Sequence, residues 1–237
     1  MKRTVVTLLL AGALMAGGCL RKESVHTLYL SPDGSVRWSA SESQVHSDAE
    51  DPGERFAEEQ SFIGPASIGG HTTALALKAL GPTSLVDTVV ARDERPFHVM
   101  TQARFDRIDT LCVRLLREVG VHGRAEMVSE AGTSTLRVIV DFSREPEQKS
   151  GPVVRMLEEG TELRIVLTAG RFAQSPGFDI ADRVQARISD GWVEQAQRAL
   201  EERRTVQLRL TWWTGTDAGS ASSDRHRQPP GITTTRR

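Results

Sequence analysis

The stretch "TLRVIVDF", residues 135–142, decides the fold class. Every second residue is apolar, and these residues form one face of a strand: Leu136, Val138, Val140 and Phe142. Two later stretches alternate in the same way, "ELRIVL" at 162–167 and "TVQLRLTWW" at 205–213. Such alternation is typical of an antiparallel sheet that helices cover on one face only.

A helix is predicted just before these strands, in "DRIDTLCVRLLREVG" at 106–120. Asp106 is expected to cap its start, and Gly120 to end it. The apolar residues recur at helical spacing and form one stripe: Ile108, Leu111, Cys112, Leu115 and Val119. Cys112 is therefore expected to behave as a small buried hydrophobic residue rather than as a reactive thiol.

Residues 97–213 read as strand, helix, strand, strand, strand, helix, strand. In this reading residues 179–204 form a short helix and then a longer one. The order resembles the βαββαβ order of ferredoxin-like folds with one additional strand. The sequence therefore predicts an α+β body, with an antiparallel sheet and helices packed on one face.

A hairpin and two short helices are expected before that body. Residues 25–41 alternate on both sides of "SPDG" at 31–34, which suits a type I turn with Gly34 at a positive φ. The stretches at 51–63 and 71–80 predict the helices. Gly81-Pro82 ends the second helix and offers a sub-boundary near residue 82.

The amino-terminal residues carry the pattern of an export signal. Lys2 and Arg3 precede about fifteen uncharged, mostly apolar residues at 4–18, fewer than the roughly 20 that a spanning helix needs. The run ends in "AGGC" at 16–19, which resembles the lipobox of bacterial lipoproteins. That resemblance implies cleavage after Gly18, a diacylglyceryl group on the Cys19 thiol and an acylated new amino terminus.

The expected organisation follows from this assignment. Residues 1–18 are a signal peptide, 19–24 a lipidated tether, 25–213 the globular body and 214–237 a disordered tail. Leu20 is not the aspartate that marks retention in the inner membrane of many lipoproteins. The resemblance thus favours the outer membrane over the inner one, with the body in the periplasm. An ordinary signal peptide, with Cys19 incidental, is the alternative.

Composition indicates an ordinary globular body. Charged residues make up 26% and hydrophobic residues 38% of the chain. The net charge of −1 gives no reason to expect nucleic acid as a partner. Once Cys19 is assigned to lipid, Cys112 has no second cysteine with which to form a disulfide.

Four tempting chemical sites fail on their residues or spacing. "GPASIGGHTT" at 64–73 lacks the lysine of a phosphate-binding loop, and Ser67 has Pro65 where a nucleophile elbow has glycine. The acidic residues from Asp48 to Glu59 place Pro52 where a calcium loop needs a ligand. The six histidines show no zinc-ligand spacing. We expect no metal and no cofactor, and the catalytic residues, if any, are unknown.

One polar face of the predicted strands is a candidate surface for a protein partner. If the strands are neighbours, this face carries Arg137, Arg164, Arg209 and Trp213. Arginine and tryptophan are enriched in interface hot spots. The alternative is a solvated face on which the arginines pair with Glu162 and Asp141.

The sequence thus predicts a lipid-anchored cell-envelope protein with a non-catalytic structural, accessory or assembly role. Its partners would be the membrane, through lipidated Cys19, and an envelope protein. The alternative is a periplasmic small-ligand-binding protein or hydrolase whose site is dispersed in the sequence. The sequence leaves enzymatic activity open but favours its absence.

Overall fold

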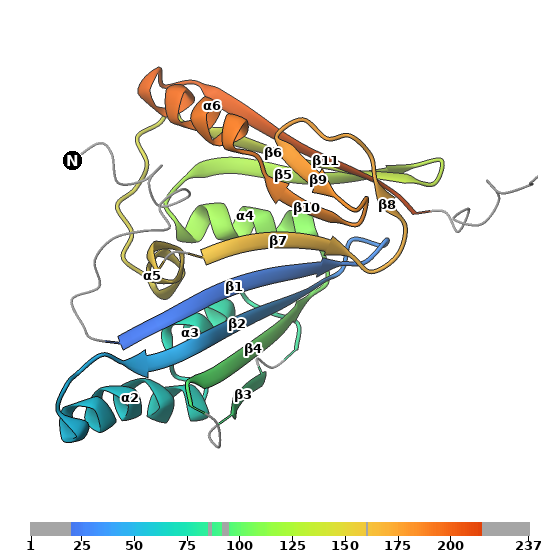
Figure 1. The fold of residues 1–237 in the computed structure, drawn as a ribbon. Coiled ribbons are helices and arrows are strands. Elements are labelled where there is room, and N and C mark those ends of the chain that lie inside the picture. The colour runs from blue at the N-terminus through green and yellow to red at the C-terminus, as the bar shows by residue number, and fades with distance from the viewer. Residues whose placement is uncertain (1–19, 85–86, 92–94, 160, 215–237) are drawn as a thin grey trace, which may run out of the picture.

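The computed structural model describes residues 20–84, 87–91, 95–159 and 161–214. The predicted signal peptide, the predicted lipid attachment at Cys19 and all of the predicted tail except Thr214 lie outside the described residues. The predicted α+β class is confirmed, with two sheets and helices packed against them (Figure 1).

One sheet has seven strands in the order β3-β4-β2-β1-β7-β10-β9. Its strands are β1 (Leu20–Leu30), β2 (Val36–Ser47), β3 (Asp87–Ala91), β4 (Phe97–Phe105), β7 (Thr161–Leu167), β9 (Phe178–Ala181) and β10 (Gln185–Ile188). The other sheet has four strands in the order β5-β6-β11-β8. Its strands are β5 (His122–Glu130), β6 (Thr133–Asp141), β8 (Arg171–Phe172) and β11 (Thr205–Trp213). The helices are α2 (Pro52–Ser67), α3 (Thr72–Ala79), α4 (Ile108–Glu118), α5 (Pro152–Glu158) and α6 (Asp190–Glu201).

The predicted first hairpin is confirmed, and it forms the middle of the larger sheet. β1 and β2 pair antiparallel, from Leu30 opposite Val36 to Leu20 opposite Ser47. Gly34 adopts a φ of 88° in the turn, which is the conformation that glycine tolerates best. The β1–β2 pair is therefore the scaffold on which the neighbouring strands and helices are placed.

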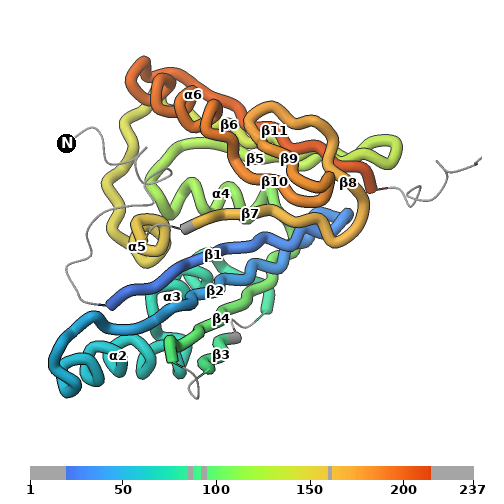
Figure 2. Tube along the Cα trace, in the orientation of Figure 1, coloured from blue at the N-terminus to red at the C-terminus, as the bar shows by residue number. Residues whose placement is uncertain are grey.

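The ferredoxin-like arrangement predicted for residues 97–213 is not formed, because the strands divide between two sheets. β4 and β7 belong to the larger sheet, whereas β5, β6 and β11 form the smaller one. β7 pairs in parallel with β1, and Figure 2 shows them side by side although they are far apart in the chain. Alternation marks a strand but does not determine its neighbours, so it could not reveal this long-range pairing.

Most of the core is common to both sheets. Leu30 and Trp38 of the larger sheet belong to the same buried cluster as Leu210 and Trp212 of the smaller one. α4 and α6 add their apolar stripes to this cluster. A smaller cluster of Val45, Ile63, Ala66, Phe97 and Val99 lies where α2 packs on the larger sheet.

Several local predictions hold and others need correction. The two early helices and the helix from Ile108 are confirmed. Arg107, and not Asp106, is the cap residue of α4. The short helix predicted after residue 178 is wrong, because residues 178–188 form the hairpin of β9 and β10. α5 lies in a stretch for which no helix was predicted.

Residues 20–24, expected to be a polar tether, belong to strand β1. Leu20 pairs with Ser47 and Arg21 with His46, so the described chain is part of the sheet from its first residue. Lys22 sits in the bulge between the two registers. This placement brings the beginning of β1 into the site described next.

Candidate functional site

The Lys22 side chain lies largely buried between the larger sheet and the helices, with 16% of it exposed. Its ammonium nitrogen is 2.7 Å from Oε1 of Glu42 on β2 and 2.5 Å from Oε2 of Glu159 at the end of α5. The same nitrogen lies 5.1 Å from the centre of the Phe62 ring on α2. One lysine therefore joins β1, β2, α2 and α5.

Glu42 is the buried centre of this arrangement, with 1% of its side chain exposed. Its Oε2 lies 3.0 Å from Nε2 of His71, the residue that caps α3. His71 is also buried; its Nε2 is 3.3 Å from the Thr101 hydroxyl on β4, and its ring meets Phe62 edge-on at 5.9 Å. We call Lys22, Glu42, His71 and Glu159 the Lys22–Glu42 network.

The charges of the network stabilise one another against burial. Burial pushes the pKa of Glu42 upward, but hydrogen bonding to His71 and the charge of Lys22 outweigh it and lower that pKa to about 2. Burial pushes the pKa of Lys22 downward, but Glu42 and Glu159 together hold it above its ordinary value. Glu42 is therefore a carboxylate and Lys22 an ammonium at neutral pH.

A second buried histidine lies beside the network on β1. His26 is 1% exposed, and its Nδ1 accepts a hydrogen bond of 3.1 Å from the indole nitrogen of Trp38. Burial lowers the pKa of His26 to about 4, although the charge of Glu42 opposes the shift. His26 is thus neutral at neutral pH and acts as an acceptor in the core.

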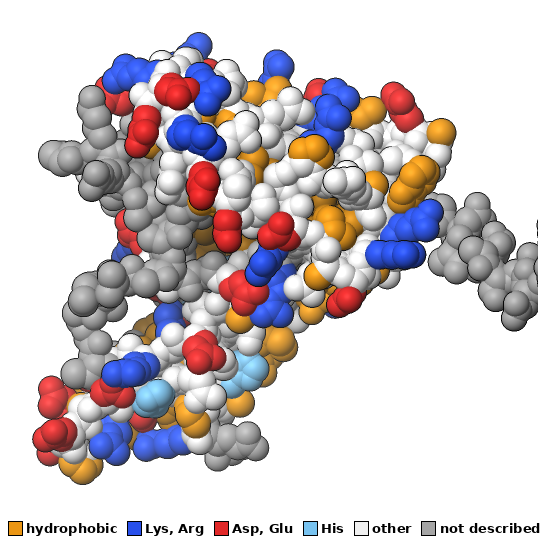
Figure 3. Space-filling view, turned by 45° about the horizontal axis from the view of Figure 1, so that its top comes forward, with side chains coloured by type: hydrophobic (Ala, Val, Ile, Leu, Met, Phe, Trp, Pro, Cys, Tyr) orange, Lys and Arg blue, Asp and Glu red, His pale blue; other side chains and the backbone are white. Residues whose placement is uncertain are grey.

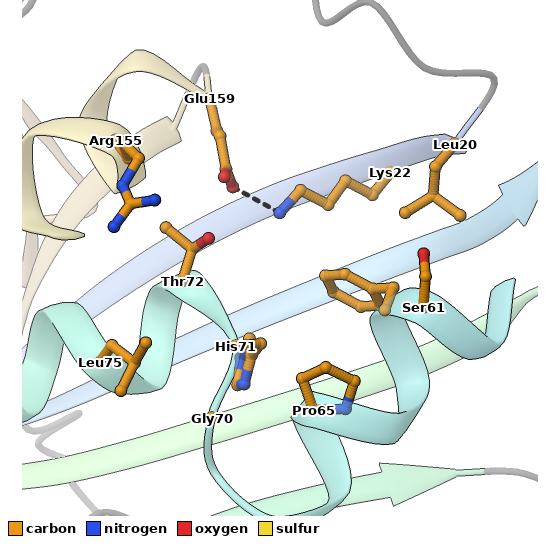
Figure 4. Close-up of a pocket in the computed structure, with 11 residues that line it drawn as sticks. Leu20, Lys22, Ser61, Pro65, Gly70, His71, Thr72, Leu75, Arg155 and Glu159 are labelled. Atoms are coloured by element: carbon orange, nitrogen blue, oxygen red, sulfur yellow. Dashed lines mark hydrogen bonds and ion pairs between the residues drawn. The ribbon is translucent and has the colours of Figure 1, made fainter. Parts of the chain in front are cut away.

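A pocket of about 430 Å³ opens beside the network (Figure 4). Its walls come from β1, α2, the segment before α3, α3 itself and α5, and they are formed by Leu20, Lys22, Ser61, Phe62, Pro65, Gly70, His71, Thr72, Leu75, Arg155 and Glu159. Figure 4 shows Lys22 and Glu159 reaching toward each other across the pocket, with Leu20 at one end and Leu75 at the other. The pocket thus combines apolar ends with charged groups.

The residues of the predicted partner face are only partly brought together. Arg137 and Arg209 are direct cross-strand neighbours on β6 and β11, and Trp213 ends the same β11 strand. Arg164 lies on β7, in the other sheet, and its guanidinium makes two hydrogen bonds of 2.9 Å to Glu162. Of the four residues, three therefore share the smaller sheet.

These three residues remain accessible on the smaller sheet. Arg137 has 43% of its side chain exposed and lies 3.5 Å from Glu126. Trp213 is 44% exposed, with the Arg171 guanidinium 5.8 Å from its ring. Because these contacts are exposed to solvent, the neighbouring arginines Arg137 and Arg209 and the Trp213 ring remain accessible on the surface.

The rejected sites occupy ordinary structural positions. Ser67 lies in the last turn of α2, and its hydroxyl donates to the Ile63 carbonyl. Glu59 is buried and lies 3.2 Å from the Arg95 guanidinium. Burial raises the pKa of the Cys112 thiol to about 12, which disfavours the reactive thiolate.

The Lys22–Glu42 network was not predicted from the sequence. The alternation of β1 extends back from Leu30 and Leu28 through His26 to Lys22, and all of these lie on one face of the strand. The hairpin predicted from the sequence begins at Val25. Extending its alternating face three residues further back, to Lys22, places a lysine under the helices. The carboxylates and His71 that meet it come from distant segments, for which the sequence carries no signal.

The part of the chain that the structure describes contains no helix that is long and apolar enough to cross a membrane. It also contains no group of three or more histidine, cysteine or carboxylate side chains placed to hold a metal ion.

No protein family profile matches this chain, and no curated protein matches it. Among solved structures, it is similar to the NMR structure of the folded domain of LppM from Mycobacterium tuberculosis, with 12% sequence identity. The match covers 87% of this chain and 96% of that one, with a TM-score of 0.33. A likeness of that degree says nothing about the activity of this chain.

Proposed function

We propose that the chain is a lipid-anchored lipoprotein of the bacterial cell envelope, whose body is non-catalytic and has a structural, accessory or assembly role. The observation that carries the proposal is that the anchor residue directly precedes the folded body. The lipobox-like sequence ends at Cys19, and Leu20 already belongs to β1. Acyl chains on Cys19 would hold the folded body directly at the membrane surface.

Replacement of Cys19 tests the anchor. Cys19→Ala should leave an uncut precursor that retains residues 1–18 and incorporates no palmitate, because the acceptor thiol is missing. Cys112→Ala is the matched control, since it removes the other cysteine and should mature and label normally. Normal maturation of Cys19→Ala, measured by mass on gels and by palmitate labelling, would overturn the proposal.

The destination proposed for the lipoprotein is the outer membrane, with the body in the periplasm. The support is Leu20, which stands where many lipoproteins retained in the inner membrane have aspartate. Density fractionation of the two membranes tests this, and Leu20→Asp should move the protein to the inner membrane fraction. Because Leu20 is only partly buried, this change should leave the fold intact.

The role proposed for the smaller sheet is to dock an envelope protein through Arg137, Arg209 and Trp213. Arginine and tryptophan contribute a large share of interface hot spots. Arg164 belongs to the other sheet and is not included in this surface. Chemical crosslinking of the native protein in intact cells should yield a reproducible protein partner, and Trp213→Ala should abolish that crosslink.

A second candidate function is the binding of a small ligand in the pocket beside the network. The convergence of Lys22, His71, Arg155 and Glu159 on a pocket of about 430 Å³ favours it. Pockets that combine apolar walls with a few placed polar groups are typical of ligand sites. Recovery of a bound small molecule from protein purified out of the envelope would support this alternative.

A further inference from the structure

One apolar end of the pocket, at Leu20, lies next to the proposed anchor at Cys19. Leu75 of α3 lines the opposite end. Consecutive Cα atoms are about 3.8 Å apart. Acyl chains on Cys19 would therefore start within one residue of the pocket wall, with no flexible linker to hold the body away from the bilayer.

Large apolar side chains stand exposed on the side of the pocket formed by α2 and α3. Ile68, directly after α2, is 83% exposed, and Leu75 is 41% exposed. Ile68 belongs to the same surface, because a Cβ atom on the pocket residue Gly70 would lie 3.7 Å from its Cγ1. Grouped exposed apolar side chains mark surfaces that contact a partner or a membrane.

The charges at this surface suit a phosphate layer. Arg155 on α5 lines the pocket and is exposed, and no described residue forms an ion pair with it. The nearby carboxylate of Glu159 is engaged by Lys22, and Asp48 is engaged by Arg21. Arg155 is therefore a cation at this surface that no carboxylate of the described residues neutralises.

Most of the exposed carboxylates of α2 lie at its other end. Figure 3 shows Asp and Glu side chains gathered at the lower left, where α2 begins. Asp51 and Glu54 are both exposed at the start of α2, and Asp51 is about 25 Å along the helix from Ile68, at 1.5 Å per residue. These carboxylates need not approach a phosphate layer that Ile68 contacts.

We propose that the membrane face, formed by Leu20, Ile68, Leu75 and Arg155, rests on the phospholipid surface in which Cys19 is anchored. Ile68 and Leu75 enter the interfacial layer, and Arg155 meets lipid phosphates. The pocket then opens toward the headgroups rather than toward the aqueous periplasm. The inference rests on the proposed function, because the anchor on Cys19 supplies the short connection.

A fluorescence experiment on the mature lipoprotein tests this placement. The protein carrying Ile68→Cys is labelled with an environment-sensitive fluorophore and reconstituted into phosphatidylcholine vesicles with and without doxyl-labelled acyl chains. Val184→Cys is the matched control, because Val184 is also exposed, at 37%, but lies between β9 and β10. Leu75→Cys is a second position on the membrane face.

The label at 68 or 75 should shift to shorter wavelength and be quenched several-fold more than the label at 184. Equal, weak quenching at all three positions, on protein that floats with the vesicles, would overturn the membrane face and leave the lipid anchor standing. Protein that does not float with the vesicles would overturn both. Shielding of position 68 in native membranes, without quenching by doxyl chains, would instead show a protein occupant and overturn the proposal.

Anionic lipid tests the role of Arg155. Adding phosphatidylglycerol to the vesicles should increase quenching at position 68, because the guanidinium gains charged partners. Arg155→Gln in the labelled protein should remove that increase and should lower quenching in phosphatidylcholine less, because that headgroup carries no net charge. An increase that survives Arg155→Gln would contradict the assignment of Arg155 to the phosphate layer.

Discussion

Both sheets contribute apolar side chains to one core, but the larger sheet also buries charged side chains against its helices. The smaller sheet turns an apolar row inward, with Leu208, Leu210 and Trp212 all buried. The larger sheet places Lys22 and Glu42 on its helix-covered face, with only 1% of the Glu42 side chain exposed. The larger sheet thus adds paired charges to the apolar packing that both sheets share.

Apolar packing and buried ion pairs contribute differently to the fold: the first mainly adds stability, and the second mainly fixes where the elements meet. Apolar burial stabilises a fold by roughly 25 cal/mol per Å², without any need for a particular partner. A buried ion pair contributes little net stability over an apolar replacement, but removing one partner is costly. The Lys22–Glu42 network therefore fixes where the start of β1, α3 and α5 meet, which is where the pocket forms.

The largest effect is expected from breaking the network on one side. Glu42→Leu leaves Lys22 and His71 without their shared carboxylate and should lower the free energy of unfolding by about 3–5 kcal/mol. Urea denaturation measures this loss. The double variant Lys22→Met/Glu42→Leu should lose less than the single one, because no unpaired lysine remains on β1. If the double variant lost as much free energy of unfolding as the two single variants added together, the pair would not act as a unit.

The next effect is a loss of stability in weak acid. The pKa of His26 is about 4 in the fold against an ordinary value of 6.5, so the unfolded chain takes up the proton first as pH falls. The contribution of neutral His26 to the free energy of unfolding is fully present above pH 6.5 and is lost between pH 6.5 and about 4. At 1.36 kcal/mol per pH unit, this loss is about 3 kcal/mol.

Replacement of His26 isolates this contribution. His26→Gln offers the Trp38 indole another acceptor and should flatten the stability curve between pH 6.5 and 5, above the range in which most carboxylates titrate. The measurement is the urea midpoint at each pH. An unchanged slope in the variant would mean that other groups cause the acid sensitivity.

The smallest effects are expected on the open face of the smaller sheet. Arg137→Gln should change the free energy of unfolding by less than about 1 kcal/mol, because its contact with Glu126 is exposed to solvent. Trp213→Ala should have a similarly small effect, of about 1 kcal/mol or less, since Trp213 is 44% exposed and the Arg171 guanidinium lies as far as 5.8 Å from the ring centre. Thermal or urea denaturation of both variants checks these values. A large loss from Trp213→Ala would mean that the residue belongs to the core and not to a docking surface.

The sequence predicts local structure well where a short period carries the signal. The strands through Leu136 and Leu208, the helix from Ile108 and the hairpin around Gly34 follow from alternation, helical spacing and turn chemistry. The division into two sheets does not follow, because the parallel pairing of β1 with β7 joins distant segments. Residues 178–188 were misread because strands of four residues show too little alternation to exclude a helix.

The candidate site was missed for the same reason. Lys22 reads as part of a polar tether next to a lipidated cysteine, and Glu42 as one polar residue among the serines of β2. Neither pattern shows that the two side chains face each other under α2 and α3. For the predicted partner face, the adjacency of Arg137 and Arg209 follows from strand alternation, whereas Arg164 could not be assigned to a sheet from its own strand. That this face binds a partner stays a prediction.

The mass of the amino-terminal peptide of the mature protein tests the central claim most directly. Protein extracted from cell membranes with detergent is digested, and its first peptide is analysed by mass spectrometry. The account predicts a peptide that begins at Cys19 and carries the mass of a diacylglyceryl group and an amide-linked acyl chain. A mature amino terminus elsewhere, or an unmodified Cys19, would contradict the account.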